Sequence, residues 1–151
     1  MKLYSYQMVA TCVNENATVE TCSCPADILS CMAGAFDERP EQEQVWLIFL
    51  NRQNKIKGRL LLTIGTQTAS LADPREIIRA ALLANATAFV MVHNHPSGNP
   101  YPSAEDVFIT KTVRDAAKIC AMVFQDHVIV GDSTCDSAGK GYYSFKEAGL
   151  I

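Results

Sequence analysis

The chain has 151 residues, a formal net charge of −3 at pH 7, 48% hydrophobic residues and 19% charged residues. This composition suits one globular domain with a substantial core, and it excludes disordered and fibrous classes of protein. No apolar run approaches the length that crosses a bilayer and no apolar signal core follows Met1, so we expect a cytoplasmic protein without membrane partners.

The N-terminal part of the chain predicts two short elements. Apolar and polar residues alternate over 3–10, as in a half-buried strand, and 14–24 is polar and irregular. Residues 25–33 predict a short helix that ends before Pro40, because proline disfavours helical geometry in the residue before it. These residues carry no chemistry that indicates a function.

A hairpin and a capped helix follow. The continuous apolar run 45–50 is typical of a buried central strand, and 56–64 predicts a second strand after a polar turn. Asp73 is placed to cap a helix that begins with Pro74. That helix is expected to bury one apolar stripe: Ile77, Ile78, Ala81 and Leu82.

The second half of the chain predicts further strands around one long helix. Residues 88–92 form another buried apolar run, and a helix of about four turns is expected from Ser103. Its buried face is predicted from the apolar spacing: Ile109, Val113, Ala116 and Cys120. Residues 122–124 and 128–130 predict two short strands, and 142–145 a last extended piece.

The cysteines predict free thiols. The chain has six of them: Cys12, Cys22, Cys24, Cys31, Cys120 and Cys135. Because the chain is large enough to fold on its own core and shows no secretory signal, we expect reduced cysteines rather than a disulfide framework. Cys22, Cys24 and Cys31 lie close in sequence, but no fourth ligand stands at a spacing that is familiar from zinc sites.

A polar stretch at 93–106 stands where a strand ends and a helix begins, a common place for chemistry in α/β proteins. On a strand, His93 and His95 point to the same side, and Pro96 keeps His95 extended. Asp106, in the first turn of the following helix, can return to them across the intervening loop. Two histidines and one carboxylate with an open fourth position suit a catalytic zinc ion.

Each of these residues also has an ordinary structural interpretation. Ser103 and Asp106 together form a capping box, which is a common way to begin a helix. A single histidine at a strand end is more often a polar residue without a ligand role. The zinc hypothesis depends on the conjunction of two histidines in strand register, a loop rich in proline and glycine, and a carboxylate at the helix start.

The spacing of His93, His95, Ser103 and Asp106 matches the JAMM signature of the JAB/MPN metalloprotease-like superfamily, and the flanking segments resemble its RadC family. The matching strings are 73–77, 93–100, 102–103, 126–131 and 143–150. The resemblance implies a single RadC-like JAB/MPN domain over residues 1–151, with 1–24 as an N-terminal strand and loop. It implies an α/β fold with a curved mixed sheet flanked by helices, in a cytidine-deaminase-like layout.

The resemblance also implies a reaction. The family pattern places a glutamate on the strand before the hairpin, facing the metal; Glu43 matches that position, and Glu41, with the same strand parity, remains the alternative. The implied mechanism has zinc-activated water, Glu43 as general base and Ser103 as a donor to the oxyanion. The implied reaction is hydrolysis of an amide, peptide or isopeptide bond in a peptide or protein substrate.

Two other functions compete with hydrolysis. A role in DNA repair or recombination is associated with the RadC name, but the net charge of −3 and the lack of a basic run argue against direct nucleic-acid binding. We also expect no N-terminal helix-hairpin-helix region like that of full-length RadC proteins, for which 151 residues leave no room. The second competing function is that of an interaction module without catalysis. Such a module would not need all four polar groups, that is, the three metal ligands and the glutamate. The oligomeric state and the substrate are not predicted.

Three further polar residues have expected supporting roles. His127, next to Asp126 between two apolar segments, is interpreted as a hydrogen-bonded structural histidine. Asn94 and Ser97 either orient the histidine ligands or, in the case of Ser97, serve the turn that follows.

Overall fold

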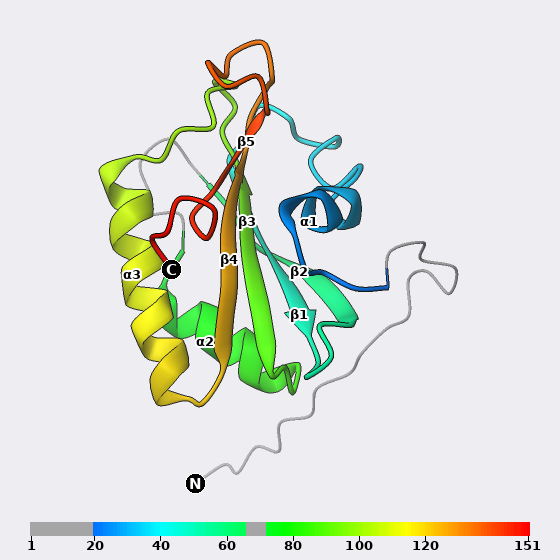
Figure 1. The fold of residues 1–151 in the computed structure, drawn as a ribbon, viewed down its shortest axis with the longest axis vertical. Coiled ribbons are helices and arrows are strands. Elements are labelled where there is room, and N and C mark those ends of the chain that lie inside the picture. The colour runs from blue at the N-terminus through cyan, green and yellow to red at the C-terminus, as the bar shows by residue number, and fades with distance from the viewer. Residues whose placement is uncertain (1–19, 66–71) are drawn as a thin grey trace, which may run out of the picture.

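The computed structural model describes residues 20–65 and 72–151, so the strand predicted at 3–10 lies outside the described residues. In chain order the elements are α1 (Pro25–Cys31), β1 (Gln44–Leu50), β2 (Ile56–Ile64), α2 (Pro74–Leu83), β3 (Ala88–Asn94), α3 (Ala104–Ile119), β4 (Val123–Val130) and β5 (Tyr142–Ser144). The strands form one mixed sheet in the order β2-β1-β3-β4-β5, with α1 on one face and α2 and α3 on the other (Figure 1). The expected α/β fold, a mixed sheet flanked by helices, is confirmed.

The pairing of the strands decides which residues meet at the ends of the sheet. β1 pairs antiparallel with β2 and with β3, whereas β3 pairs parallel with β4. Parallel neighbours need a crossover connection, and α3 supplies it. The start of β1, the end of β3 and the start of α3 therefore lie at one end of the sheet, with Val45 paired opposite His93.

Each face of the sheet has its own apolar core. Under α2 and α3 the core includes Leu47 and Phe89, and the Phe89 ring stacks on Phe124 with the centroids 5.1 Å apart. Under α1 it includes Ile28 of the helix and Ile48 of β1. Neighbouring residues of a strand point to opposite faces, so a strand that is covered on both sides must be apolar throughout. This explains the uninterrupted apolar runs of β1 and β3.

Two expectations about the buried surface of the helices are wrong. Leu82 is 54% exposed, although Ile77, Ile78 and Ala81 are buried as predicted. The buried line of α3 also differs from the expected one and consists of Asp106, Thr110, Val113 and Ala117, with Ile109, Ala116 and Cys120 only partly buried beside it. Apolar spacing misplaces this line because two of its members are polar residues that find hydrogen-bond partners inside the protein.

The third difference concerns β4, which is one continuous strand rather than two short ones. Residues 125–127, which were expected to separate the two strands, instead lie within β4, and Asp126 and His127 are buried there. Both side chains are hydrogen-bonded, so the strand continues through polar residues that resemble a break in an apolar pattern.

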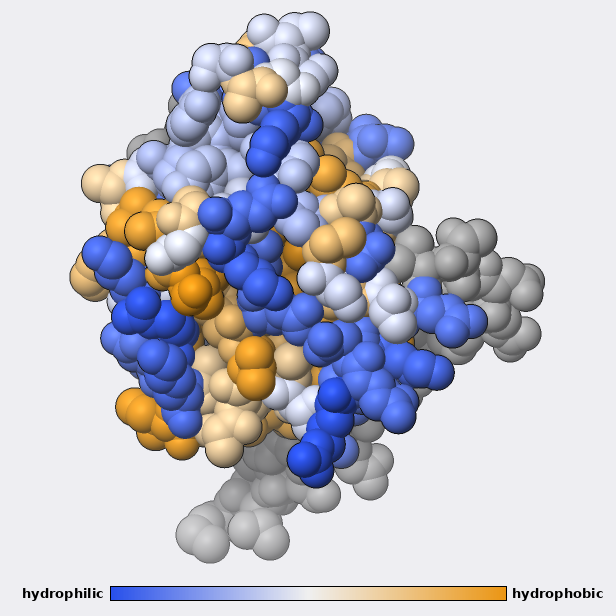
Figure 2. Space-filling view, in the orientation of Figure 1, coloured by the Kyte–Doolittle hydropathy of each residue, from blue (hydrophilic) through white to orange (hydrophobic). Residues whose placement is uncertain are grey.

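The surface is mixed in character. Figure 2 shows mostly hydrophilic to neutral residues at the upper end of the molecule and separate apolar areas lower down, along α3. Phe108 and Ile119 of α3 are 71% and 87% exposed. Within the described ranges, no helix has the length and apolar character that a membrane crossing requires.

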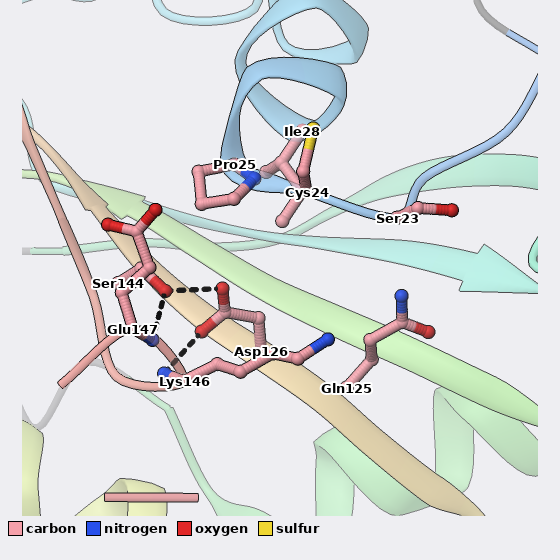
Figure 3. A pocket seen from close by; sticks show the side chains of 9 residues that line it. All are labelled: Ser23, Cys24, Pro25, Ile28, Gln125, Asp126, Ser144, Lys146 and Glu147. Atoms are coloured by element: carbon pink, nitrogen blue, oxygen red, sulfur yellow. Dashed lines mark hydrogen bonds between the residues drawn. The ribbon is translucent and has the colours of Figure 1, made fainter. Parts of the chain in front are cut away.

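Asp126 anchors β4 to the C-terminal turn. Its carboxylate accepts hydrogen bonds from the Ser144 hydroxyl at 2.6 Å, the Lys146 backbone N–H at 3.0 Å and the His127 backbone N–H at 2.7 Å. Figure 3 shows Asp126, Ser144 and Lys146 at the side of a pocket that Cys24 and other residues near the start of α1 also line. Burial raises the pKa of Asp126, and the three donors oppose this rise only in part.

We expect the Asp126→Ala variant to lose about 3 kcal/mol of unfolding free energy, because the change leaves buried donors without an acceptor. Urea denaturation measures this loss. Asp115→Ala on the exposed side of α3 is the matched control and should change stability by less than about 0.5 kcal/mol. Equal stability of the two variants would show that Asp126 is not an anchor.

Candidate metal centre

Four potential metal ligands gather at the end of the sheet where β1 starts and β3 ends. They are Glu43, His93, His95 and Asp106, and one ligand atom from each lies within 4.8 Å of all the others. Glu43 directly precedes β1, while the other three come from β3, the residue after it and the first turn of α3. Glu41, the alternative to Glu43, is an exposed turn residue and does not belong to this group.

The distances within the group fit a tetrahedral ion. His93 Nε2 lies 3.0 Å from His95 Nε2 and 3.2 Å from Asp106 Oδ1, and His95 Nε2 lies 3.5 Å from Asp106 Oδ2. Two ligands that are each about 2.0–2.1 Å from a tetrahedral zinc ion are separated by about 3.3 Å. The two imidazoles and the carboxylate are therefore spaced as three corners of one coordination tetrahedron.

His95 is held by the loop that follows it. Its Nδ1 lies 2.7 Å from the carbonyl oxygen of Asn99, and a carbonyl can only accept a hydrogen bond. Nδ1 therefore carries the proton, and Nε2, which faces the other ligands, is the nitrogen that can bind a metal. The backbone N–H of His95 also donates to Val130 O at 2.9 Å, which continues the pairing of β3 and β4 beyond the last residue of β3.

Asp106 is held by the predicted capping box. Both the backbone N–H and the hydroxyl of Ser103 donate to Asp106 Oδ2, at 2.8 and 2.6 Å, and the Asp106 N–H donates to Ser103 Oγ at 3.1 Å. Burial alone raises the pKa of Asp106, but the imidazoles of His93 and His95 and the Ser103 hydroxyl outweigh burial and hold this pKa well below its usual value. The carboxylate is ionised, as a metal ligand must be.

His93 is supported from behind by His127. His93 Nδ1 lies 2.8 Å from His127 Nε2, and His127 Nδ1 lies 2.6 Å from Thr110 Oγ1. Burial lowers the pKa of His127 well below its usual value, so its ring is neutral. The structural, hydrogen-bonded role expected for His127 is confirmed. Thr110 was not identified from the sequence, although its position one helical turn after Asp106 places both residues on one face of α3.

Asn94 holds the glutamate rather than a histidine. Its amide oxygen accepts from the Gln44 backbone N–H at 2.8 Å, and its amide nitrogen donates to the Gln42 carbonyl at 3.1 Å. These two peptide groups lie on either side of Glu43, so Asn94 sets the position of the Glu43 backbone relative to the histidines. Ser97 accepts a long hydrogen bond of 3.4 Å from the Asn99 N–H, which is the turn role considered for it.

Glu43 lies on the open side of the group. Its carboxylate is 3.7 Å from His93 Nε2, and its side chain is 30% exposed, compared with 2% and 3% for His93 and Asp106. Burial raises the pKa of Glu43, an effect that the nearby His93 and His95 partly oppose. A carboxylate with a raised pKa at the solvent side of a metal site is suited to accepting a proton from water.

The cysteines at the described positions take no part in this group. Among the described residues, Cys22 is buried, Cys31 is partly buried and Cys24 is exposed, and each is a free thiol. Burial raises the pKa of the Cys22 thiol to about 12, which keeps it protonated and unreactive at neutral pH.

The loop that holds His95 packs closely on the loop after β4. The Asp132 N–H donates to Gly98 O at 2.7 Å, and Gly98 has a positive φ of 81°. A Cβ atom at Gly131 would overlap Gly98 O and stand 2.9 Å from Pro100 N. Only glycine fits at 131, so the position of Asn99, and through it His95, depends on this close approach.

The fold and the site define an α/β domain with a potential metal-binding group of two histidines, an aspartate and a glutamate at one end of its sheet. Residues 22–150 match the family described as the RadC-like JAB domain. The chain belongs to this family, as its motif predicts.

Relatives support the same assignment. The UPF0758 protein of Thermotoga maritima is 42% identical over 111 residues, covering 74% of this chain and 47% of that protein. The UPF0758 protein of Methanosarcina mazei is 33% identical over 129 residues, covering 85% and 53%. That of Streptococcus gordonii is 40% identical over 107 residues, covering 71% and 44%. The chain thus spans about half the length of the curated relatives it matches.

We expect Gly131→Ala to reduce the free energy of unfolding by about 1–3 kcal/mol, because the added methyl group must displace backbone atoms of the neighbouring loop. Urea denaturation measures the effect. Gly58→Ala is the matched control, since a Cβ atom there meets nothing within 4 Å. A Gly131→Ala protein as stable as the control would show that the two loops do not need this contact.

Proposed function

We propose that the protein is a zinc-dependent hydrolase of amide, peptide or isopeptide bonds. The observation that carries this proposal is the tetrahedral spacing of two imidazole nitrogens and one carboxylate oxygen, with a second, more exposed carboxylate beside them. A closed structural site has four protein ligands around the metal, whereas three ligands with a carboxylate on the open side match a site that acts on water.

Nitrogen and carboxylate donors of this kind suit zinc. A zinc ion at this position would supply Lewis-acid activation of a water molecule near neutral pH. In the proposed reaction Glu43 accepts a proton from the attacking water at a carboxylate oxygen and delivers it to the leaving amine. His93, His95 and Asp106 stay fixed during these steps because each is held by a second hydrogen-bond partner.

Ser103 is the proposed donor to the oxyanion that forms on the attacked carbonyl. In the structure its only hydroxyl proton is directed to Asp106 Oδ2. The proposed role therefore requires the hydroxyl to rotate away from Asp106, while the Ser103 N–H, at 2.8 Å, continues to hold that oxygen. A donor of this kind typically contributes about 3 kcal/mol to transition-state stabilisation.

The proposed substrate is a peptide or protein, and the proposed location is the cytoplasm. Free thiols at all the described cysteines are in keeping with a reducing compartment. The alternative role in DNA repair or recombination has weaker support, because the net charge of −3 provides no general attraction to a polyanion.

We expect the purified protein to retain about one zinc ion per chain, and His95→Ala and Asp106→Ala to lose it, because two donors cannot complete the site. Elemental analysis after dialysis measures the metal content. Asp115→Ala removes an exposed carboxylate from the same helix and should keep the wild-type zinc content. Wild-type protein without zinc would contradict the proposed metal site.

We expect Glu43→Gln to keep its zinc but to lose turnover by a factor of about 10²–10⁴, because glutamine cannot accept the proton. Libraries of internally quenched peptides and of lysine isopeptides are suitable probes of turnover. Glu41→Gln, in the exposed turn beside the site, is the matched control and should behave as wild type. Unchanged turnover in Glu43→Gln would remove Glu43 from the mechanism.

A further inference from the structure

We propose that Thr110 and His127 are positioning residues that fix the tautomer of His93 and thereby set the affinity of the site for zinc. The inference rests on the proposed metal site but assigns roles to two residues outside the ligand set. The contacts that carry it form a chain from the Asp106 backbone carbonyl through Thr110 and His127 to His93.

The direction of these hydrogen bonds is set by the Asp106 carbonyl oxygen, which can only accept a hydrogen bond. Thr110 Oγ1 lies 2.5 Å from the carbonyl oxygen of Asp106, so the single hydroxyl proton of Thr110 is directed there. The same Thr110 oxygen lies 2.6 Å from His127 Nδ1 and must act as an acceptor towards it. His127 therefore carries its proton on Nδ1.

The tautomer of His127 in turn determines the tautomer of His93. With its proton on Nδ1, the fully buried His127 presents a lone pair at Nε2, 2.8 Å from His93 Nδ1. His93 must place a proton on Nδ1 to complete this hydrogen bond. Its Nε2, which lies 3.0 Å from His95 Nε2 and 3.2 Å from Asp106 Oδ1, is left as the ligand nitrogen.

The opposite direction is incompatible with metal binding. If Thr110 donated to His127 Nδ1, the proton of His127 would move to Nε2 and His93 would have to accept at Nδ1. A His93 ring with a single proton would then carry that proton on Nε2, where the metal must bind. The His127 ring is also stacked on Phe145, with the centroids 4.7 Å apart and an angle of 7° between the planes, which limits rotation of the ring out of the chain.

The first experiment measures zinc affinity, using zinc alone in competition with a chromophoric chelator. Thr110→Val keeps the shape of the side chain but removes the hydroxyl, and we expect affinity to fall by about 10- to 100-fold. Thr110→Ser restores the hydroxyl and should restore affinity to within about twofold of wild type. Thr112→Val is the matched control, because Thr112 makes the same backward hydrogen bond, to Phe108 O at 3.0 Å, on the exposed side of the helix.

The second experiment reads the tautomers directly. Long-range ¹H–¹⁵N NMR spectra of the wild-type protein should show a proton on Nδ1 of both His127 and His93, and this measurement does not depend on enzymatic turnover. A proton on Nε2 of His127 in the folded wild-type protein would overturn the inference. So would a folded Thr110→Val protein that binds zinc as tightly as wild type.

These outcomes separate the inference from the proposed function. Wild-type protein that binds no zinc contradicts the metal site, and the NMR tautomers still decide the direction of the chain. Wild-type protein that binds zinc, with Thr110→Val and Thr112→Val equal to it, retains the metal site and rejects the positioning role. Urea denaturation of each variant confirms that the affinities compared belong to folded proteins.

Discussion

Asp106 takes part in the N-terminal cap of α3, in the group of potential metal ligands and in the hydrogen bonds that support His93, and it uses a different part of the residue for each. Its carboxylate faces His93 and His95, its N–H completes the helix cap with Ser103, and its carbonyl orients Thr110. A buried charge is tolerated only with partners, and Asp106 has them on both sides of its carboxylate. The position of α3 against the sheet and the geometry of the site therefore depend on each other, because both are fixed by Asp106.

This dependence explains why α3 buries a line that is polar at one end. Val113 and Ala117 pack into the core between the sheet and α2, as apolar residues of an amphipathic helix do. Towards the N-terminus the same line reaches Thr110 and Asp106, which meet histidines instead of apolar side chains. The apolar end supplies the packing that holds the polar end in place, and the hydrogen bonds remove the cost of burying it.

Local patterns in the sequence are sufficient to predict the strands β1, β2 and β3, the helix starts at Pro74 and Ala104, and the proximity of His93, His95 and Asp106. They were insufficient wherever the partner of a polar residue lies far along the chain. Asn94 bonds the peptide groups around Glu43, 50 and 52 residues away, and nothing in its neighbours indicates that target. The continuity of β4 and the buried line of α3 were misjudged for the same reason, since hydrophobic patterning treats every polar residue as exposed.

The four residues are held by different partners, and the site has a buried side and an exposed side. His93 and Asp106 are buried and held by groups inside the fold, whereas His95 is held by a loop carbonyl and Glu43 is the most exposed of the four. In the proposed reaction a substrate would approach from the side of Glu43 and His95, which are the more exposed residues of the four. His93 and Asp106 are held by side chains and a helix cap inside the fold, whereas the position of His95 depends on a backbone carbonyl of the loop that follows it.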